Sequence, residues 1–289
     1  MPPRPSDEVP LLTPWIGKDG TVAGRAAEGQ PPKAPEAPVP AAKQAEAEAP
    51  ASAGRKLLWF ALPACGVMLL LAITNKLCQD IAVVPFLWVL PLSLYLLSFI
   101  ISFDSPRWYH RGFWLPLLAI LLGLVLQNLY KAESHPDITP LATLYLGTMF
   151  VACMVCHGEV YRLRPGASRL TGFYLSLSAG GAAGGLFVAL AAPFVFPDYF
   201  ELHLALFLTA ALVLIVLRQD PTRPFREGQA RWAWAVPFVA LAVLGYGLAD
   251  VATTSLRGSL STTRGFYGVL KVNDNDAGND GLHHLTLQH

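Results

Sequence analysis

The string Cys153-Met-Val-Cys156-His157 carries the most specific chemistry in the sequence, because it matches the CxxCH motif of covalent haem attachment. In that chemistry the two thiols bond the haem and the histidine ligates its iron. Both cysteines here stand in an apolar segment, where a free cysteine acts as a small hydrophobic side chain. A zinc site that adds Glu159 has suitable ligand types but lacks a second ligand pair elsewhere. We therefore expect no bound metal and no cofactor.

His157 and Glu159 also stand together where an apolar segment ends, just before the string Tyr161-Arg-Leu-Arg164-Pro. Ionisable groups at the boundary of a membrane span are candidates for function, so both are candidate polar or substrate contacts. The alternative is a hydrogen-bonded cluster at the interface, in which this pair meets Arg162 or Arg164.

A second pair of candidate contacts, Asn75 and Asp80, lies in the short polar string Thr74-Asn-Lys-Leu-Cys-Gln-Asp80. A substrate or ion can meet such groups at the edge of a membrane. The simpler alternative is a structured turn in which Lys76 pairs with Asp80. No catalytic role is assigned to either pair.

Four glycines, Gly180, Gly181, Gly184 and Gly185, lie in the middle of one apolar segment. They form two overlapping GxxxG pairs, which let a second helix backbone approach closely in a membrane. The first interpretation is packing against another membrane helix or within a protein complex. The alternative is a flexible or broken helix at a transport site, although no carboxylate accompanies the glycines inside the segment.

The C-terminal residues differ from everything before them, because the strand-like runs 265–272 and 282–289 flank the turn-forming cluster 273–280. This pattern predicts a β-hairpin. The aspartates of the cluster do not fit a calcium loop, since Gly278 stands at a ligand position and no glutamate closes the loop.

Seven apolar segments must position all of these groups, and none of the seven contains Asp, Glu, Lys or Arg. A helix needs about 20 apolar residues to cross the hydrocarbon core of a bilayer. Because every backbone group in lipid must be bonded internally, the segments are expected to be helices. The predicted fold class is an all-α polytopic membrane protein with about seven transmembrane helices. The segments are 57–75, 81–103, 113–129, 138–156, 172–196, 202–217 and 232–249.

Composition supports a membrane location, since 53% of the 289 residues are hydrophobic and only 14% are charged, against about 25% charged in soluble domains. A net charge of +1 does not suggest a nucleic-acid partner. Of the Lys and Arg residues that flank the seven segments, eleven lie on the same side of the membrane as Arg55 and two lie on the opposite side. The positive-inside rule then predicts a cytoplasmic N-terminus. The expected location is a bacterial inner membrane.

Three parts follow from these patterns. Residues 1–55 are rich in proline and alanine and should form a disordered tail, because they cannot bury enough apolar surface to offset chain entropy. Residues 56–250 form the transmembrane domain. Residues 251–289 form a linker and the hairpin, which is marginal in water by itself and so reads as the start of a further domain.

Several strings together resemble the membrane-bound spermidine synthase-like proteins, also called fused transporter/spermidine synthase proteins. The resemblance covers the chain from about residue 57 to its end. It rests on Thr74-Asn75, on Asp80-Ile-Ala-Val-Val-Pro85-Phe-Leu-Trp88-Val-Leu-Pro91-Leu-Ser-Leu-Tyr95, on Cys156-His157-Gly158-Glu159-Val-Tyr161-Arg-Leu-Arg-Pro165, on Phe173-Tyr174-Leu-Ser-Leu-Ser-Ala-Gly180-Gly181-Ala-Ala-Gly184-Gly185-Leu-Phe187, and on Arg264-Gly-Phe266-Tyr267-Gly268-Val-Leu.

The resemblance implies a membrane domain followed by a small β-domain and then a doubly wound domain of the kind that binds S-adenosylmethionine-type cosubstrates. The hairpin looks like the opening of the β-domain. No nucleotide-binding fingerprint and no acidic pair for a polyamine occur in the 289 residues. The chain therefore reads as a fragment or truncated product, and no catalysis is expected from it alone.

Three functions fit the sequence. The favoured one is the membrane domain of a spermidine synthase-like protein, acting as an anchor or partner module in the lipid bilayer. The second is a transporter of a small metabolite, including cationic ones. The third is a structural subunit of a larger membrane complex that packs through the glycine face.

Overall fold

The computed structural model describes residues 52–80, 86–131, 138–220, 234–257, 259–265, 268–275 and 284–288. The chain divides into two units, Met1–Glu46 and Ala47–His289. The first unit, and with it nearly all of the predicted disordered tail, lies outside the described residues. The second unit holds all the described elements. Its first helix begins at Ala53, so the last residues assigned to the tail are helical.

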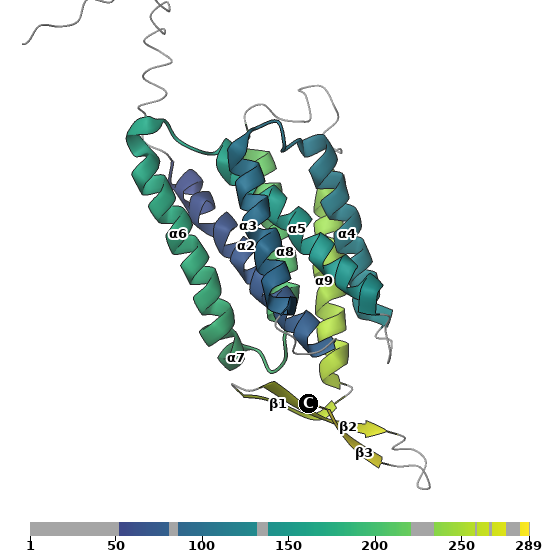
Figure 1. Cartoon of the computed structure of the whole chain (residues 1–289). Coiled ribbons are helices and arrows are strands. Elements are labelled where there is room, and N and C mark those ends of the chain that lie inside the picture. Colours follow the sequence, from purple (N-terminus) through teal and green to yellow (C-terminus); the bar gives the residue numbers. More distant parts are fainter. Residues whose placement is uncertain are drawn as a thin grey trace, which may run out of the picture. The chain divides into compact units, whose positions relative to one another are not determined.

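The second unit is a helical bundle with a small sheet (Figure 1). Six of its described helical segments are long and apolar enough to cross a membrane, and α3 is apolar but shorter. This confirms the predicted all-α polytopic fold class. The helices are α2 (Ala53–Asp80), α3 (Phe86–Asp104), α4 (Arg111–Lys131), α5 (Ile138–Arg162), the 3-10 turn η1 (Ala167–Arg169), α6 (Leu170–Leu186), the π turn η2 (Phe187–Ala191), α7 (Ala192–Val195), α8 (Glu201–Gln219) and α9 (Ala235–Arg257).

Side-chain contacts between helix ends show that α5 and α6, and likewise α8 and α9, run in opposite directions. The indole of Trp59 near the start of α2 donates to the carbonyl of Leu163 just after α5, at 3.0 Å. Trp59 also packs edge-on against Phe173 near the start of α6. Arg218 at the end of α8 lies over the ring of Phe238 near the start of α9. The arginine-bearing ends therefore gather at one end of the bundle, as the charge pattern requires; we call it the arginine end.

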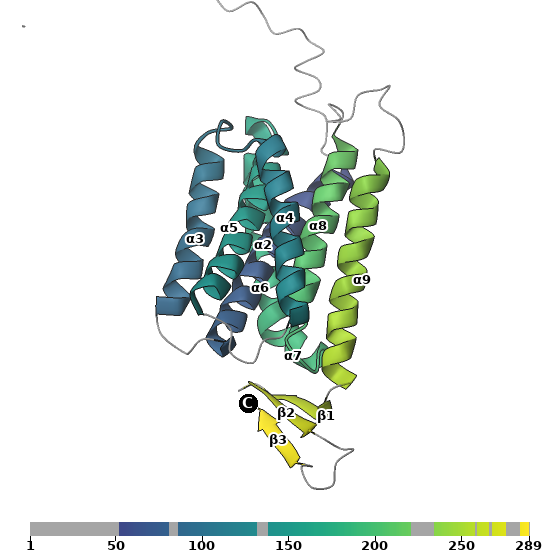
Figure 2. The same ribbon diagram turned by 90° about the vertical axis from the view of Figure 1, so that its right-hand side faces the viewer.

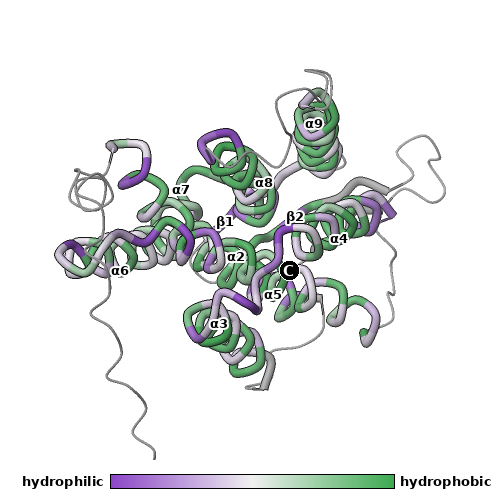
Figure 3. The backbone as a smooth tube through the Cα atoms, turned by 90° about the horizontal axis from the view of Figure 1, so that it is seen from above, coloured by the Kyte–Doolittle hydropathy of each residue, from purple (hydrophilic) through white to green (hydrophobic). Residues whose placement is uncertain are grey.

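The two most deeply buried helices are α2 and α5, and the other helices lie around them (Figure 3). Leu62, Leu69 and Ile73 of α2 are fully buried, as are Tyr145 and Met149 of α5. The outer helices expose leucine, valine and phenylalanine side chains instead. Such side chains are the expected surface of a span that faces lipid.

Prolines inside the spans have different effects. The helices α2, α3 and α4 continue through Pro63, Pro91 and Pro116. At Pro193 the span changes form, because the π turn η2 ends two residues before it. Proline removes one backbone donor and crowds the carbonyl four residues earlier, and a wider turn relieves that crowding.

The C-terminal strands form an antiparallel sheet in the order β1-β2-β3 (Figure 2). The strands are β1 (Ser259–Gly265), β2 (Gly268–Asn275) and β3 (His284–Gln288). The predicted hairpin corresponds to β2 and β3. In place of the predicted linker, α9 continues to Arg257 and β1 pairs with β2. The polar string Ser-Leu-Ser-Thr-Thr-Arg-Gly of β1 becomes a strand because a neighbouring strand satisfies its backbone.

Candidate functional site

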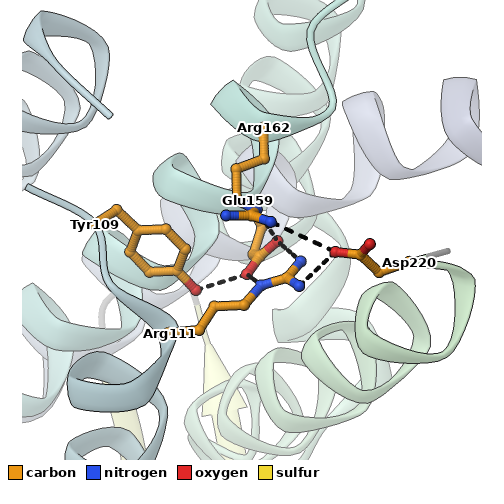
Figure 4. Close-up of polar contacts among 5 residues, drawn as sticks. All are labelled: Tyr109, Arg111, Glu159, Arg162 and Asp220. Carbon is orange, nitrogen blue, oxygen red and sulfur yellow. Dashed lines mark hydrogen bonds and ion pairs between the residues drawn. The ribbon is translucent and has the colours of Figure 1, made fainter. Parts of the chain in front are cut away.

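Glu159 lies at the centre of five side chains at the arginine end, the Glu159 cluster (Figure 4). Arg111 reaches both carboxylate oxygens of Glu159, with Nε at 2.6 Å and Nη2 at 2.7 Å. Tyr109 donates its hydroxyl to the same carboxylate at 2.7 Å. Asp220 accepts a hydrogen bond from Arg111 and lies 3.5 Å from a guanidinium nitrogen of Arg162. Arg162 Nε lies 4.0 Å from Glu159.

Helix ends and one glycine place the members of the Glu159 cluster. Arg111 begins α4, Glu159 lies in the last turn of α5, and Asp220 caps the C-terminus of α8. Tyr109 lies in the connection before α4, and its ring packs over Gly158. A Cβ atom on Gly158 would lie 2.6 Å from the Cδ2 atom of that ring, so the contact requires glycine.

The electrostatics of the Glu159 cluster are balanced, with two guanidinium groups and two carboxylates. Glu159 is 1% exposed and Arg111 15%. A buried charge is tolerated when it is paired and hydrogen-bonded, and this geometry meets both conditions. Burial raises the pKa of Tyr109 above its ordinary value, and the neighbouring Glu159 carboxylate raises it further. The phenol therefore stays protonated and keeps donating to Glu159.

Little chemical capacity is left on Glu159. A carboxylate offers about four acceptor positions, and Arg111, Tyr109 and Arg162 approach Glu159 at the distances given above. A substrate cation would have to displace one of these partners. The arrangement therefore ties helix ends together, which agrees with the interfacial cluster that the sequence offered as an alternative to a substrate contact.

His157 faces a different side of α5 from Glu159. Its Nδ1 atom lies 3.0 Å from the hydroxyl oxygen of Ser98 in α3. The rings of Tyr95 and Phe99, also from α3, pack edge-on against the imidazole. The predicted polar pair is therefore divided between two environments, with His157 inside the bundle and Glu159 in the charged cluster.

Asn75 and Asp80 lie near the other end of α2 and do not join the first pair. Gly66 of α2 is the residue beside His157, and Asn75 follows it by nine residues, or about 13 Å along a helix. Asn75 is half-buried, and the side chain of Asp80 lies outside the described residues. The four predicted contacts thus do not form one site.

A second buried ion pair joins the sheet to the bundle at the end opposite the Glu159 cluster. Arg264 of β1 donates to both carboxylate oxygens of Glu201 at 2.9 Å and 2.8 Å. It also donates to the backbone carbonyl of Asp198 and stacks on the ring of Tyr199. Arg264 is 5% exposed and Glu201 1%. Glu201 begins α8, where a negative charge is favoured by the helix dipole.

Lys271 of β2 supports the same junction. Its ammonium lies 2.5 Å from the Asp198 carboxylate and 3.1 Å from the hydroxyl oxygen of Ser255 in α9. In the strand register Arg264 pairs with Val269, two residues before Lys271, so both cations project from one face of the sheet. We call Arg264, Glu201, Lys271 and Asp198 the sheet clamp.

Sequence reasoning anticipated Arg162 as a neighbour of Glu159, but it did not find the sheet clamp or the partners Arg111 and Tyr109. The available signal was weak: a charged residue at the boundary of an apolar segment, as at Arg111, Glu201 and Asp220. The partners lie far apart in the chain, since Arg111 and Glu159 differ by 48 in residue number and Glu201 and Arg264 by 63.

The glycine face packs as predicted, and its partner is α2. A Cβ atom on Gly180 would lie 2.9 Å from the carbonyl carbon of Phe60, and one on Gly184 would lie 2.9 Å from that of Ala64. At Gly181 and Gly185 the nearest atoms are valine methyls at 3.5 Å and 3.7 Å, which is ordinary contact. The close approach of the α6 backbone to the α2 backbone is therefore made at Gly180 and Gly184, the first GxxxG pair.

The four cysteines are free thiols, and Cys65, Cys153 and Cys156 are buried in the bundle. Among the described residues, no group of three or more His, Cys, Asp or Glu side chains is placed to hold a metal ion. Comparisons with protein-family models, with curated proteins and with solved structures found no match.

Proposed function

We propose that the helical bundle is a membrane anchor that holds a β-sheet unit rigidly at one membrane face, as the membrane domain of a spermidine synthase-like protein. The observation that carries the proposal is the buried Arg264–Glu201 pair, which fixes β1 to the start of α8. A flexible linker would allow a sheet to move independently of its anchor. Here α9 runs to Arg257 and β1 begins two residues later, so the connection itself is short.

The energetic argument rests on desolvation. Removing one partner of a buried ion pair costs about 3–5 kcal/mol, because the other charge stays buried without compensation. Separation of the sheet from the bundle is a different case, because water would then solvate both charges of the pair. It would, however, break the Arg264 contacts with Tyr199 and with the Asp198 carbonyl. The Lys271–Asp198 pair adds a second tie. Several directional contacts therefore define one position of the sheet.

The proposed orientation follows the lysine and arginine distribution. The arginine end lies in the cytoplasm of a bacterial cell, and the sheet clamp lies at the outer face of the inner membrane. The charge balance of the Glu159 cluster supports a fixed bundle in this anchor function, since four charges tie α4, α5 and α8 together.

Hydrogen–deuterium exchange on the full chain in lipid nanodiscs tests this proposal. Glu201→Gln should speed amide exchange in β1 and β2 while exchange in α2 and α5 stays slow. Arg264→Gln should have the same effect, and the double variant should add little, because both changes break one interaction. Arg257→Gln is the matched control, since Arg257 is an exposed arginine at the end of α9.

Unchanged exchange of β1 and β2 in Glu201→Gln would mean that the pair does not hold the sheet. A uniform increase over helices and strands would show instead that Glu201 supports the bundle as a whole. Either result would remove the basis of the rigid-anchor function.

A further inference from the structure

Arg218 is an exposed arginine at the arginine end, and aromatic rings rather than a carboxylate hold its guanidinium. It lies one residue before the end of α8. Its Cζ atom lies 4.4 Å from the ring centre of Phe238 in the first turn of α9, and 5.9 Å from that of Trp234 just before α9. Among the described residues, no carboxylate forms an ion pair with Arg218. A stacked guanidinium keeps the N–H donors at its edge available for an anion.

The side chains next to Arg218 on the membrane side are apolar and exposed. Ile215 precedes Arg218 by three residues, so the two side chains lie on one face of α8, with Ile215 deeper in the span and 43% exposed. The helices α8 and α9 are neighbours (Figure 2), and Val239 on α9 is 60% exposed. Exposed aliphatic side chains on a span offer a surface to acyl chains. The corner between α8 and α9 therefore has a cation at the membrane boundary and apolar side chains below it.

The first turn of α2 adds positive charge beside the end of α8. A Cβ atom on Gly54 would lie 3.7 Å from the side-chain oxygen and nitrogen of Gln219, the residue after Arg218. Arg55 and Lys56 come directly after Gly54 and are exposed. Neither of them forms an ion pair with a carboxylate in the described part of the chain. An anion at Arg218 therefore meets a positive field from two helices.

We propose that the corner between α8 and α9 binds one anionic phospholipid, whose phosphate accepts hydrogen bonds from Arg218 and whose acyl chains lie along Ile215 and Val239. Two guanidinium N–H groups match two phosphate oxygens, and basic pockets between helices on the cytoplasmic side bind anionic headgroups. A zwitterionic lipid gains less, because the positive field repels its own cation. This inference rests on the membrane location of the bundle and not on the rigid attachment of the sheet.

Native mass spectrometry of the full chain tests the site, with micelles that contain phosphatidylglycerol or phosphatidylcholine of the same acyl chains. The unaltered protein should retain one phosphatidylglycerol and much less phosphatidylcholine. Arg218→Gln should lower the retention of phosphatidylglycerol at least about fivefold, which corresponds to the attraction of one arginine for an anionic surface. Amide exchange in β1 and β2 should not change in this variant, which separates this result from the test of the anchor function.

Arg107→Gln is the matched control. Arg107 is an exposed arginine in the connection from α3 to α4, at the same end of the bundle. It carries the same charge, but its guanidinium stacks on no ring among the described residues. Both variants should fold, because both side chains are exposed. Arg107→Gln should lower the retention of phosphatidylglycerol by less than about twofold at physiological ionic strength, where charges are screened over about 8 Å.

Three results would overturn the proposal. Equal losses in Arg218→Gln and Arg107→Gln would show a general attraction to the arginine end rather than a site. Equal retention of the two lipids by the unaltered protein would show that the phosphate charge is not recognised. Displacement of phosphatidylglycerol by inorganic phosphate would assign Arg218 to a soluble anion instead of a lipid.

Discussion

Replacing Gly184 with alanine should weaken the packing of α6 on α2, whereas the same replacement at Gly181 should not. At Gly184 the new methyl would lie 2.9 Å from the carbonyl carbon of Ala64, and at Gly181 it would lie 3.5 Å from a methyl of Val67. The carbonyl oxygen of Ala64 would lie nearer still, and contacts begin to be ordinary at 3.4 Å, so the backbones at Gly184 must separate by more than about 0.5 Å. A gap of that size already forfeits about a quarter of the dispersion energy of the atoms it separates.

Gly184→Ala and Gly181→Ala should therefore change the free energy of unfolding in opposite directions. Overpacking costs about 1–3 kcal/mol, while alanine in place of a helical glycine gains about 1 kcal/mol. Gly184→Ala should lower the free energy of unfolding by up to about 2 kcal/mol. Gly181→Ala should leave it unchanged or raise it by up to about 1 kcal/mol. Gly180→Ala should behave like Gly184→Ala, because it meets the carbonyl of Phe60.

Unfolding of the full chain in mixed micelles with increasing sodium dodecyl sulfate measures these differences. Trp59 fluorescence is a suitable signal, since its ring packs against Phe173 of α6 with ring centroids 5.3 Å apart. Equal stability of Gly184→Ala and Gly181→Ala would refute close backbone approach as the basis of α6 packing.

Two further predictions concern the Glu159 cluster. Glu159→Gln should lower the free energy of unfolding by about 3 kcal/mol, because Arg111 and Arg162 then face only the carboxylate of Asp220. The control is Asp104→Asn, at an exposed aspartate. It should change the free energy of unfolding by less than about 0.5 kcal/mol in the same micelle assay. Tyr109→Phe should lower stability by about 1.5–3 kcal/mol near neutral pH through the lost hydrogen bond to a charged group. Because the folded-state pKa of Tyr109 is raised, this advantage is complete below the ordinary pKa of tyrosine, about 10, and is lost as the pH rises above it. A difference between the two proteins that stays constant from pH 8 to pH 11 would contradict the assignment.

The spans were predictable because one physical requirement governs them. Long apolar runs without charges must close their own backbone hydrogen bonds in lipid, which leaves only helices. The glycine contact was predictable for a similar reason, since GxxxG spacing puts small residues on one helix edge. The sequence could not say which helix would use that edge, and α2 is the helix that does.

The ion pairs were predictable only as local possibilities. Glu159 was expected to meet Arg162 or Arg164, which are near it in the chain, and Arg162 does lie 4.0 Å away. The stronger partner is Arg111, from another helix, and Arg164 stacks on Tyr161 instead. The strand β1 was missed because its polar residues carry little apolar alternation, and its pairing and the Arg264 contacts appear only in three dimensions.

The helix α8 carries an engaged carboxylate at each end, Glu201 at its start and Asp220 at its C-terminal cap. Its 19 residues span about 28 Å, so it is a strut fixed at both membrane faces. One end is tied to the sheet, and the other end to α4 through Arg111. A tilt of α8 would strain the contacts at both of its ends at once. Force applied to the sheet on one side of the membrane is therefore transmitted to the helix ends on the other side.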